Sequence, residues 1–198
     1  MPRGRPPAFD REQVLQKLLF LFWEKGYEAT SQSDMVERAG ISSSSLYNTF
    51  GNKPDIYDAA LAHYNGMSYD ALSFLRDGEA GIDDIVAFLD MLIGFMKSDA
   101  MPAGCLMVRT MTELDGRTDG PATSERTSTY RNQITTALRM ALQRAAERGE
   151  IGGDEIAAKA SLILSMYLGA LAVAISSRET GAEMFKHGQA MVASWKPV

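Results

Sequence analysis

The sequence predicts an all-α protein, in which an N-terminal three-helix unit with a helix-turn-helix precedes a larger C-terminal helical domain. Apolar residues recur at helical spacing along the chain, and almost no stretch alternates apolar and polar residues. Two short helical segments joined by a glycine-containing turn lie between residues 31 and 53. Beyond residue 80 the helical segments are longer, and loops containing Gly, Pro or Asp separate them.

The first four helices are predicted from their capping residues. Asp10 is a suitable N-cap, and Gln13 three residues later forms the pattern of a capping box. Serine and asparagine caps begin the next three segments, and Gly40 supplies the tight turn between the second helix and the third. The expected ranges are 10–26, 31–39, 42–49 and 52 to about 76.

The rest of the chain predicts five more helices. Their expected ranges are 82–97, 105–114, 123–148, 154–177 and 180–193. We therefore divide the chain into a flexible basic arm at residues 1–9, a helix-turn-helix domain at residues 10–54 and a helical domain at residues 55–198.

The composition argues against an enzyme and against a metal protein. One cysteine excludes a disulfide framework or a cysteine-rich zinc site, and two histidines cannot form a multi-histidine centre within one chain. The sequence contains no nucleophile elbow, HExxH, phosphate loop or dinucleotide fingerprint. We expect no catalysis, no metal and no cofactor. The single cysteine and the polar N-terminus favour the cytoplasm.

Residues 160–177 form an uncharged run of 18, which is at the lower limit for a membrane span. The run holds four serines, and small residues dilute its large apolar ones. A helix that is apolar on most of its surface can also be buried in a bundle. We expect the second arrangement and keep a membrane-associated helical protein as the alternative.

The third predicted helix carries the strongest functional signal. Its exposed face reads Ser42 to Ser45, then Tyr47, Asn48 and Thr49. Four consecutive serines are poor helix formers and add nothing to a core. Small hydroxyls at a helix N-terminus allow close approach to phosphates and base edges, which is how a recognition helix enters the major groove.

At this point the sequence resembles the TetR family of bacterial regulators. GISSSSLYNTFGNK at residues 40–53 fits the family pattern of core, turn and contact positions, and FWEKGYEATSQSDMVERAG at residues 22–40 fits its first two helices. The C-terminal part is similar in length, in helical character and in a GCLM stretch at residues 104–107. The resemblance implies phosphate contacts by Tyr47 and Lys53, and backbone contacts where Thr30 and Ser31 begin the second helix. The groove-facing positions that it implies are Ser33, Ser43, Ser44, Ser45 and Asn48.

The N-terminal arm adds a second expected DNA contact. Arg3-Gly4-Arg5-Pro6 resembles the core of an AT-hook, an extended strip that fits a narrow A·T minor groove. A solvated tail is the alternative, but an arm beside a helix-turn-helix favours Arg3 and Arg5 in the minor groove.

The C-terminal domain is expected to hold a small ligand. Ten of the twelve methionines lie from Met67 onward, and methionines with aromatic residues form adaptable apolar pockets, although they also simply fill cores. Arg109 and Glu113, four residues apart, form either a solvated ion pair or polar groups that orient the ligand. The expected pocket residues are Phe88, Met91, Phe95, Cys105, Arg109, Tyr130 and Tyr167.

Cys105 has three possible roles. It is expected at a helix N-terminus, which can lower a thiol pKa, but free cysteines are also commonly buried. Structural packing, pocket lining and redox sensing all remain open.

The resemblance also implies a homodimer on a palindromic double-stranded operator. The expected interface lies on helices near 123–148 and 154–177, which would form a four-helix bundle. Its expected apolar residues are Ile156, Ala160, Ile163, Leu164, Tyr167, Leu168, Leu171 and Ile175.

The predicted function is a transcriptional repressor that a small apolar or amphipathic ligand releases from DNA. An activator shares these features, and a regulator that senses oxidants or electrophiles through Cys105 is the alternative.

Overall fold

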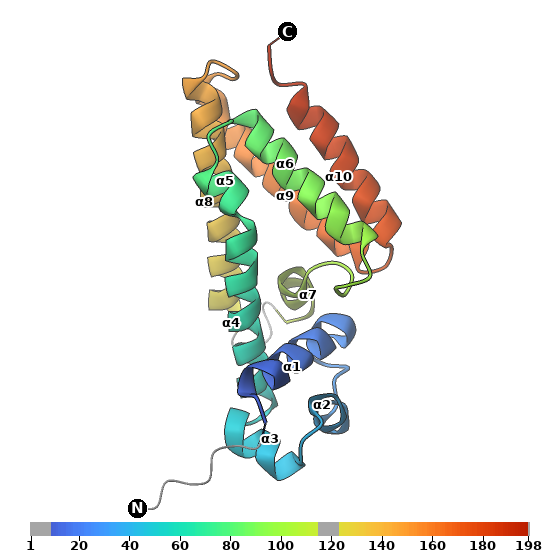
Figure 1. The fold of residues 1–198 in the computed structure, drawn as a ribbon. Helices are drawn as coiled ribbons and strands as arrows, with labels where there is room; N and C mark the ends of the chain where they lie inside the picture. Colours follow the sequence, from blue (N-terminus) through green and yellow to red (C-terminus); the bar gives the residue numbers. More distant parts are fainter. Residues whose placement is uncertain (1–8, 115–122, 198) are drawn as a thin grey trace, which may run out of the picture.

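A computed structural model describes residues 9–114 and 123–197. The described residues form α-helices and one 3-10 turn, without strands, which confirms the all-α prediction (Figure 1). The helices are α1 (Arg11–Lys25), α2 (Gln32–Ala39), α3 (Ser43–Phe50), α4 (Lys53–Ala71), α5 (Ser73–Asp77), α6 (Ile82–Lys97), α7 (Leu106–Glu113), α8 (Ser124–Glu147), α9 (Ile156–Ala174) and α10 (Arg178–Ala193), and the 3-10 turn η1 is Gly153–Glu155.

The three N-terminal helices form a compact unit at one end of the molecule (Figure 1). Fully buried Leu18 and Phe22 of α1, Met35 of α2 and Leu46 of α3 belong to its core. Gly40 has φ 69° and ψ 25°, the left-handed conformation that glycine adopts without a steric cost. This turn fixes the angle between α2 and α3, as the helix-turn-helix prediction requires.

The helix α4 leads from this unit into the rest of the protein and runs beside α8 (Figure 1). The helix α10 packs against both α6 and α9 at the other end, while the short helix α7 lies between these helices and α1. The small helix α7 therefore contacts α1, α4, α8 and α9.

The predicted helices agree with the structure within a few residues, with two differences. The fourth helix breaks at Leu72, so that α5 is separate from α4. The segment predicted at 154–177 begins with the 3-10 turn and ends at Ala174. The arm at residues 1–8 and the predicted loop at residues 115–121 lie outside the described residues.

Within the described ranges, one helical stretch, Gly153–Ala174, is long and apolar enough to span a membrane by length and composition alone. Its helix α9 packs against α8 and α10. Ile163, Tyr167 and Leu171 on that helix are buried in the protomer itself, which is the arrangement expected for a helix of a bundle.

This packing corrects the predicted dimer surface. Four of its eight residues are buried within the protomer, so they cannot contact a partner: Ala160, Ile163, Tyr167 and Leu171. Helical spacing alone could not separate the two apolar sides of α9. The side left free carries Leu162, which is 49% exposed, together with Ser161 and Ser165.

Candidate DNA interface and sensor cavity

The predicted recognition helix α3 presents a small, hydroxyl-rich face. Ser42 caps the helix, and its Oγ accepts the Ser45 N–H at 3.1 Å. The Ser42 Oγ also lies 3.1 Å from the Ser44 Oγ and donates to the Ser45 Oγ at 2.8 Å. Ser43, Ser44 and Asn48 are exposed, whereas Ser45 is half-buried. The exposed side chains of Ser43, Ser44 and Asn48 are small, so they do not hold this part of the helix away from a groove.

The residues at the start of α2 divide into exposed and buried ones. Ser31 and Ser33 are exposed, and Ser31 forms a reciprocal capping box with Asp34. Thr30 is fully buried, and its hydroxyl donates to the Gly26 carbonyl at 2.6 Å. The Thr30 side chain thus holds the loop between α1 and α2 and, being buried, does not present its hydroxyl for the DNA-backbone contact that the resemblance implies.

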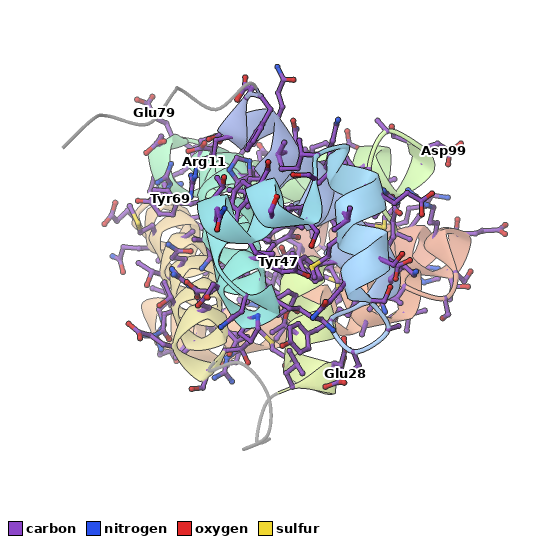
Figure 2. All side chains as sticks on the ribbon, turned by 90° about the horizontal axis from the view of Figure 1, so that it is seen from below. Arg11, Glu28, Tyr47, Tyr69, Glu79 and Asp99 are labelled. Carbon is purple, nitrogen blue, oxygen red and sulfur yellow. The ribbon has the colours of Figure 1, made fainter. Side chains whose placement is uncertain are left out.

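Tyr47 lies near the middle of the face that Figure 2 views from below. Its hydroxyl is buried and has no hydrogen-bond partner among the described residues. A phosphate contact by Tyr47 therefore requires the side chain to turn outward. Lys53, the first residue of α4, places its Nζ 4.3 Å from the centroid of the Tyr27 ring. That cation–π contact orients the ammonium group without neutralising it.

Arg3 and Arg5 lie outside the described residues, so the minor-groove role of the arm stays a prediction.

A cavity of about 140 Å³ lies in the C-terminal domain, where α1, α4, α6 and α9 meet. Predicted residues Phe88, Phe95 and Tyr167 line it, and Phe95 is 43% exposed. The full lining is Trp23, Tyr64, Met67, Ser68, Ala71, Leu72, Phe88, Leu92, Phe95, Met96, Met101, Pro102, Gly104, Tyr167 and Leu171. The wall is predominantly aromatic and thioether, which suits an apolar ligand.

Trp23 was missed by the sequence analysis, because it belongs to α1 of the helix-turn-helix unit. Its indole ring meets Tyr64 edge to face, with centroids 4.9 Å apart. The one signal in the sequence was a tryptophan on a helix face otherwise built of Leu, Phe and Val. The cavity is therefore bounded on one side by the first helix of the unit that carries α3.

The remaining predicted pocket residues lie beside the cavity. Met91 is half-buried on α6, and Cys105 and Tyr130 are buried behind the lining. Arg109 lines a separate, more polar hollow next to the cavity. Cys105 and Tyr130 face inward, as their spacing predicts, but periodicity could not tell which inward side chains border empty space.

A chain of polar groups lies behind the cavity wall. Tyr64 donates its hydroxyl to the Cys105 Sγ at 3.1 Å, and the Tyr130 hydroxyl lies 3.2 Å from the same sulfur. The Tyr130 and Tyr167 hydroxyls are 2.8 Å apart. Burial raises the pKa of the Cys105 thiol, although these hydroxyl contacts act in the opposite direction. The Cys105 side chain is thus fully enclosed, and its burial disfavours the thiolate form.

Glu113 of α7 joins the C-terminal domain to the helix-turn-helix unit. Its carboxylate accepts the Tyr27 N–H at 3.2 Å and the Glu28 N–H at 2.6 Å. Gly26 has φ 85°, and a Cβ there would lie 2.6 Å from Glu113 Oε2. No Arg109–Glu113 ion pair forms within the described part of the chain, because Glu113 binds the loop instead.

The same helix makes a second link. The Thr110 hydroxyl donates to the Leu106 carbonyl at 2.8 Å and also lies 2.8 Å from the Tyr57 hydroxyl of α4. The helix α7 therefore connects the buried thiol at its start with α4 and with the loop before α2.

Family models match both parts of the chain. The model described as bacterial regulatory proteins of the tetR family matches residues 15–60, and the one described as a tetracyclin repressor-like C-terminal domain matches residues 81–183.

Individual proteins similar to this chain are also transcriptional regulators. The chain is 35% identical over 153 residues to the HTH-type transcriptional repressor ComR of Escherichia coli K12, covering 75% of this chain and 71% of that protein. It is 30% identical over 106 residues to the repressor BdcR of the same organism, covering 53% and 54%. Among solved structures, a cysteine mutant of the TetR family regulator CifR complexed with 26-bp operator DNA has a TM-score of 0.82 at 27% identity, covering 94% of this chain and 98% of that one.

We expect Lys53→Ala to weaken binding to duplex DNA about equally for all sequences. Loss of one phosphate contact should reduce the slope of log affinity against log salt by about 1. Fluorescence anisotropy of a labelled duplex across a salt series measures this slope. Lys186→Ala, on α10 far from α3, is the control. An unchanged slope for Lys53→Ala would remove Lys53 from the interface.

We expect iodoacetamide to modify Cys105 at pH 7 about 100-fold more slowly than it modifies a free thiol, because only an accessible thiolate reacts. Since burial raises the thiol pKa, the rate should increase as the pH rises through the alkaline range. Mass spectrometry of the intact chain follows the reaction, and the urea-unfolded chain is the control. Complete modification of the folded protein within minutes at pH 7 would instead identify a reactive sensor thiol.

Proposed function

The chain belongs to the TetR family of bacterial regulatory proteins, and from this premise we propose that it is a repressor that leaves its operator when an effector occupies the cavity beside Trp23. It is a DNA-binding transcription regulator and not an enzyme. The observation that carries the effector proposal is that α1, a core helix of the DNA-binding unit, also forms a wall of the cavity.

DNA recognition is assigned to α3 and the residues around it. The exposed Ser43, Ser44 and Asn48 are proposed to face base edges, since small polar groups permit the helix to sit deeply in the major groove. Ser31, Ser33, Tyr47 and Lys53 are proposed to hold the phosphate backbone. The arm residues Arg3 and Arg5 are proposed for the adjacent minor groove.

The regulator acts as a homodimer, as is typical of the family. We assign α9 to the interface on the side that carries Leu162, because the opposite side of this helix already packs within the protomer. A two-fold axis in the protein would match a palindromic operator. The cytoplasm is the proposed location, where the DNA target lies.

We propose that α1 and α7 transmit the effector signal. An effector that pushes Trp23 moves α1, and a movement of α7 is passed to the loop before α2 through Glu113. Both routes change the position of α2 and α3 relative to the C-terminal domain. A dimer on DNA requires a fixed distance between its two recognition helices, so a small change suffices to weaken binding.

The second candidate is a thiol-sensing regulator with Cys105 as the switch. Two tyrosine hydroxyls around the sulfur would stabilise a thiolate once it formed. Its full burial and raised pKa disfavour the first reaction with an oxidant or electrophile. We therefore prefer release by a bound effector.

Selection of bound sites from random duplex DNA tests the regulatory function. We expect a palindrome whose half-sites are one or two helical turns apart, bound by a dimer. Light scattering of the complex measures the protein-to-DNA ratio. Recovery of a motif without two-fold symmetry would contradict the proposed dimeric mode of binding.

Glu113→Gln tests the junction. The glutamine side chain carries no negative charge. Its amide oxygen can accept one of the two backbone N–H groups, but its NH₂ group cannot accept the other. We expect a loss of about 1–3 kcal/mol in unfolding free energy and faster hydrogen exchange at the Tyr27 and Glu28 amides. Urea unfolding and NMR exchange measure these effects, with the exposed Glu79→Gln as the control. Unchanged exchange at both amides would show that Glu113 does not hold this loop.

A further inference from the structure

A second hollow, of about 370 Å³, lies at the junction between the DNA-binding unit and the C-terminal helices. It is more polar than the cavity, and it is lined by the end of α1, the loop before α7, Arg109 of α7 and the start of α10. Trp23, Met101 and Pro102 line both spaces. The apolar cavity and the polar hollow are therefore neighbours that share one wall.

Arg109 is the cation of the hollow that has no partner among the described residues. Its Nε is buried without a hydrogen bond, and no ion pair of its guanidinium forms within the described ranges. Glu113, four residues along the same helix, binds the Tyr27 and Glu28 amides instead. A buried guanidinium N–H without an acceptor is unfavourable, so a ligand that brings an acceptor gains binding free energy here.

The other charged groups around the hollow are already engaged or face solvent. Arg178 donates to the Ser98 carbonyl at 2.6 Å and to the Met101 carbonyl, which holds the loop in place. Glu24 is bound to Arg38, with Arg38 Nη2 2.6 Å from Glu24 Oε2. Asp99 is exposed and lies near the rim of the view in Figure 2. Water screens its charge more effectively than that of a buried group.

The shared wall supplies a second donor. Trp23 is buried, and its Nε1 has no hydrogen-bond partner in the part of the chain that the structure describes. Two unpartnered N–H donors, from Trp23 and Arg109, thus belong to residues lining the same hollow, and no neighbouring side chain there supplies their acceptor. This pattern favours a ligand group that only accepts hydrogen bonds and is negatively charged.

We propose that the effector is a small amphipathic carboxylate, whose carboxylate binds Arg109 in the hollow while its apolar body occupies the adjoining cavity. This inference rests on the proposed effector function and adds the chemical class of the ligand. The cavity volume is close to that of engineered cavities that bind benzene, so one aromatic ring or a short alkyl chain fits. The planar guanidinium matches a carboxylate in geometry.

A phosphate group fits this hollow less well. A phosphate monoester carries nearly two negative charges at neutral pH, and such groups are bound by clusters of cations. Arg109 is the cation left without a partner among the described residues that line the hollow, since Arg178 is bound to carbonyl groups. One guanidinium is balanced by one carboxylate.

The test compares 4-phenylbutanoate with its neutral amide, 4-phenylbutanamide, which has nearly the same shape. Trp195→Phe leaves Trp23 as the sole tryptophan, so fluorescence titration reports binding at the shared wall. Arg109→Met removes the guanidinium group and keeps an unbranched apolar stem, while Arg109→Lys keeps the charge without the planar fork. Arg139→Met on the exposed face of α8 is the matched control.

We expect the carboxylate to bind about 10-fold more tightly than the amide. This preference should fall below about 2-fold in Arg109→Met, remain in part in Arg109→Lys and be unchanged in Arg139→Met. Equal affinities for acid and amide, or an undiminished preference in Arg109→Met, overturn the inference. Failure of all phenylalkanoates with two to five methylenes to bind saturably overturns it as well.

Anisotropy of the selected operator duplex separates this inference from the proposed function. If the amide binds as well as the acid and still releases the operator, the effector function stands and the carboxylate site is wrong. If the acid binds through Arg109 but leaves operator affinity unchanged, the carboxylate site stands and the proposed release mechanism is wrong.

Discussion

The helix α1 packs into the core of the helix-turn-helix unit and also forms a wall of the cavity. The rest of this protein depends on this double packing. Leu18 and Phe22 belong to the core of the helix-turn-helix unit, and Trp23 closes a wall of the cavity. Closely packed interiors tolerate little displacement, so α1 cannot shift toward or away from the cavity without moving the unit that it supports. This packing supports the proposal that a ligand at that wall acts on the orientation of α3 without touching it.

The short helix α7 reinforces this arrangement through polar contacts. Thr110 meets Tyr57 of α4, and Glu113 accepts two backbone amides of the loop before α2. Bonds from a carboxylate to backbone N–H groups are stronger than neutral ones and depend on geometry. Thr30 completes the same loop from within the unit by donating to Gly26. The loop is thus held from both domains, which makes it a suitable point for a signal to pass.

The charge balance of residues 1–60 fits the proposed mechanism. Residues 1–60 contain seven Lys and Arg against eight Asp and Glu, so charge alone does not hold the unit on DNA. In the proposed mode of binding, affinity would then depend on correctly spaced contacts from the small polar face of α3 in two protomers. A regulator that relies on spacing more than on charge is released by a modest change in geometry.

The sequence by itself determined the helices, the turn at Gly40 and the exposed serine face of α3, because caps, periodicity and turn residues are local signals. It also predicted Phe88, Phe95 and Tyr167 as pocket residues, and these three line the cavity, although Phe95 is 43% exposed. Only the tertiary structure decided which inward residues border empty space, that Trp23 joins them, that Leu171 is buried within the protomer, and that Glu113 binds the loop rather than Arg109. These outcomes depend on which helices meet, and residues more than eighty positions apart, such as Glu113 and Tyr27, carry no local signal of their contact.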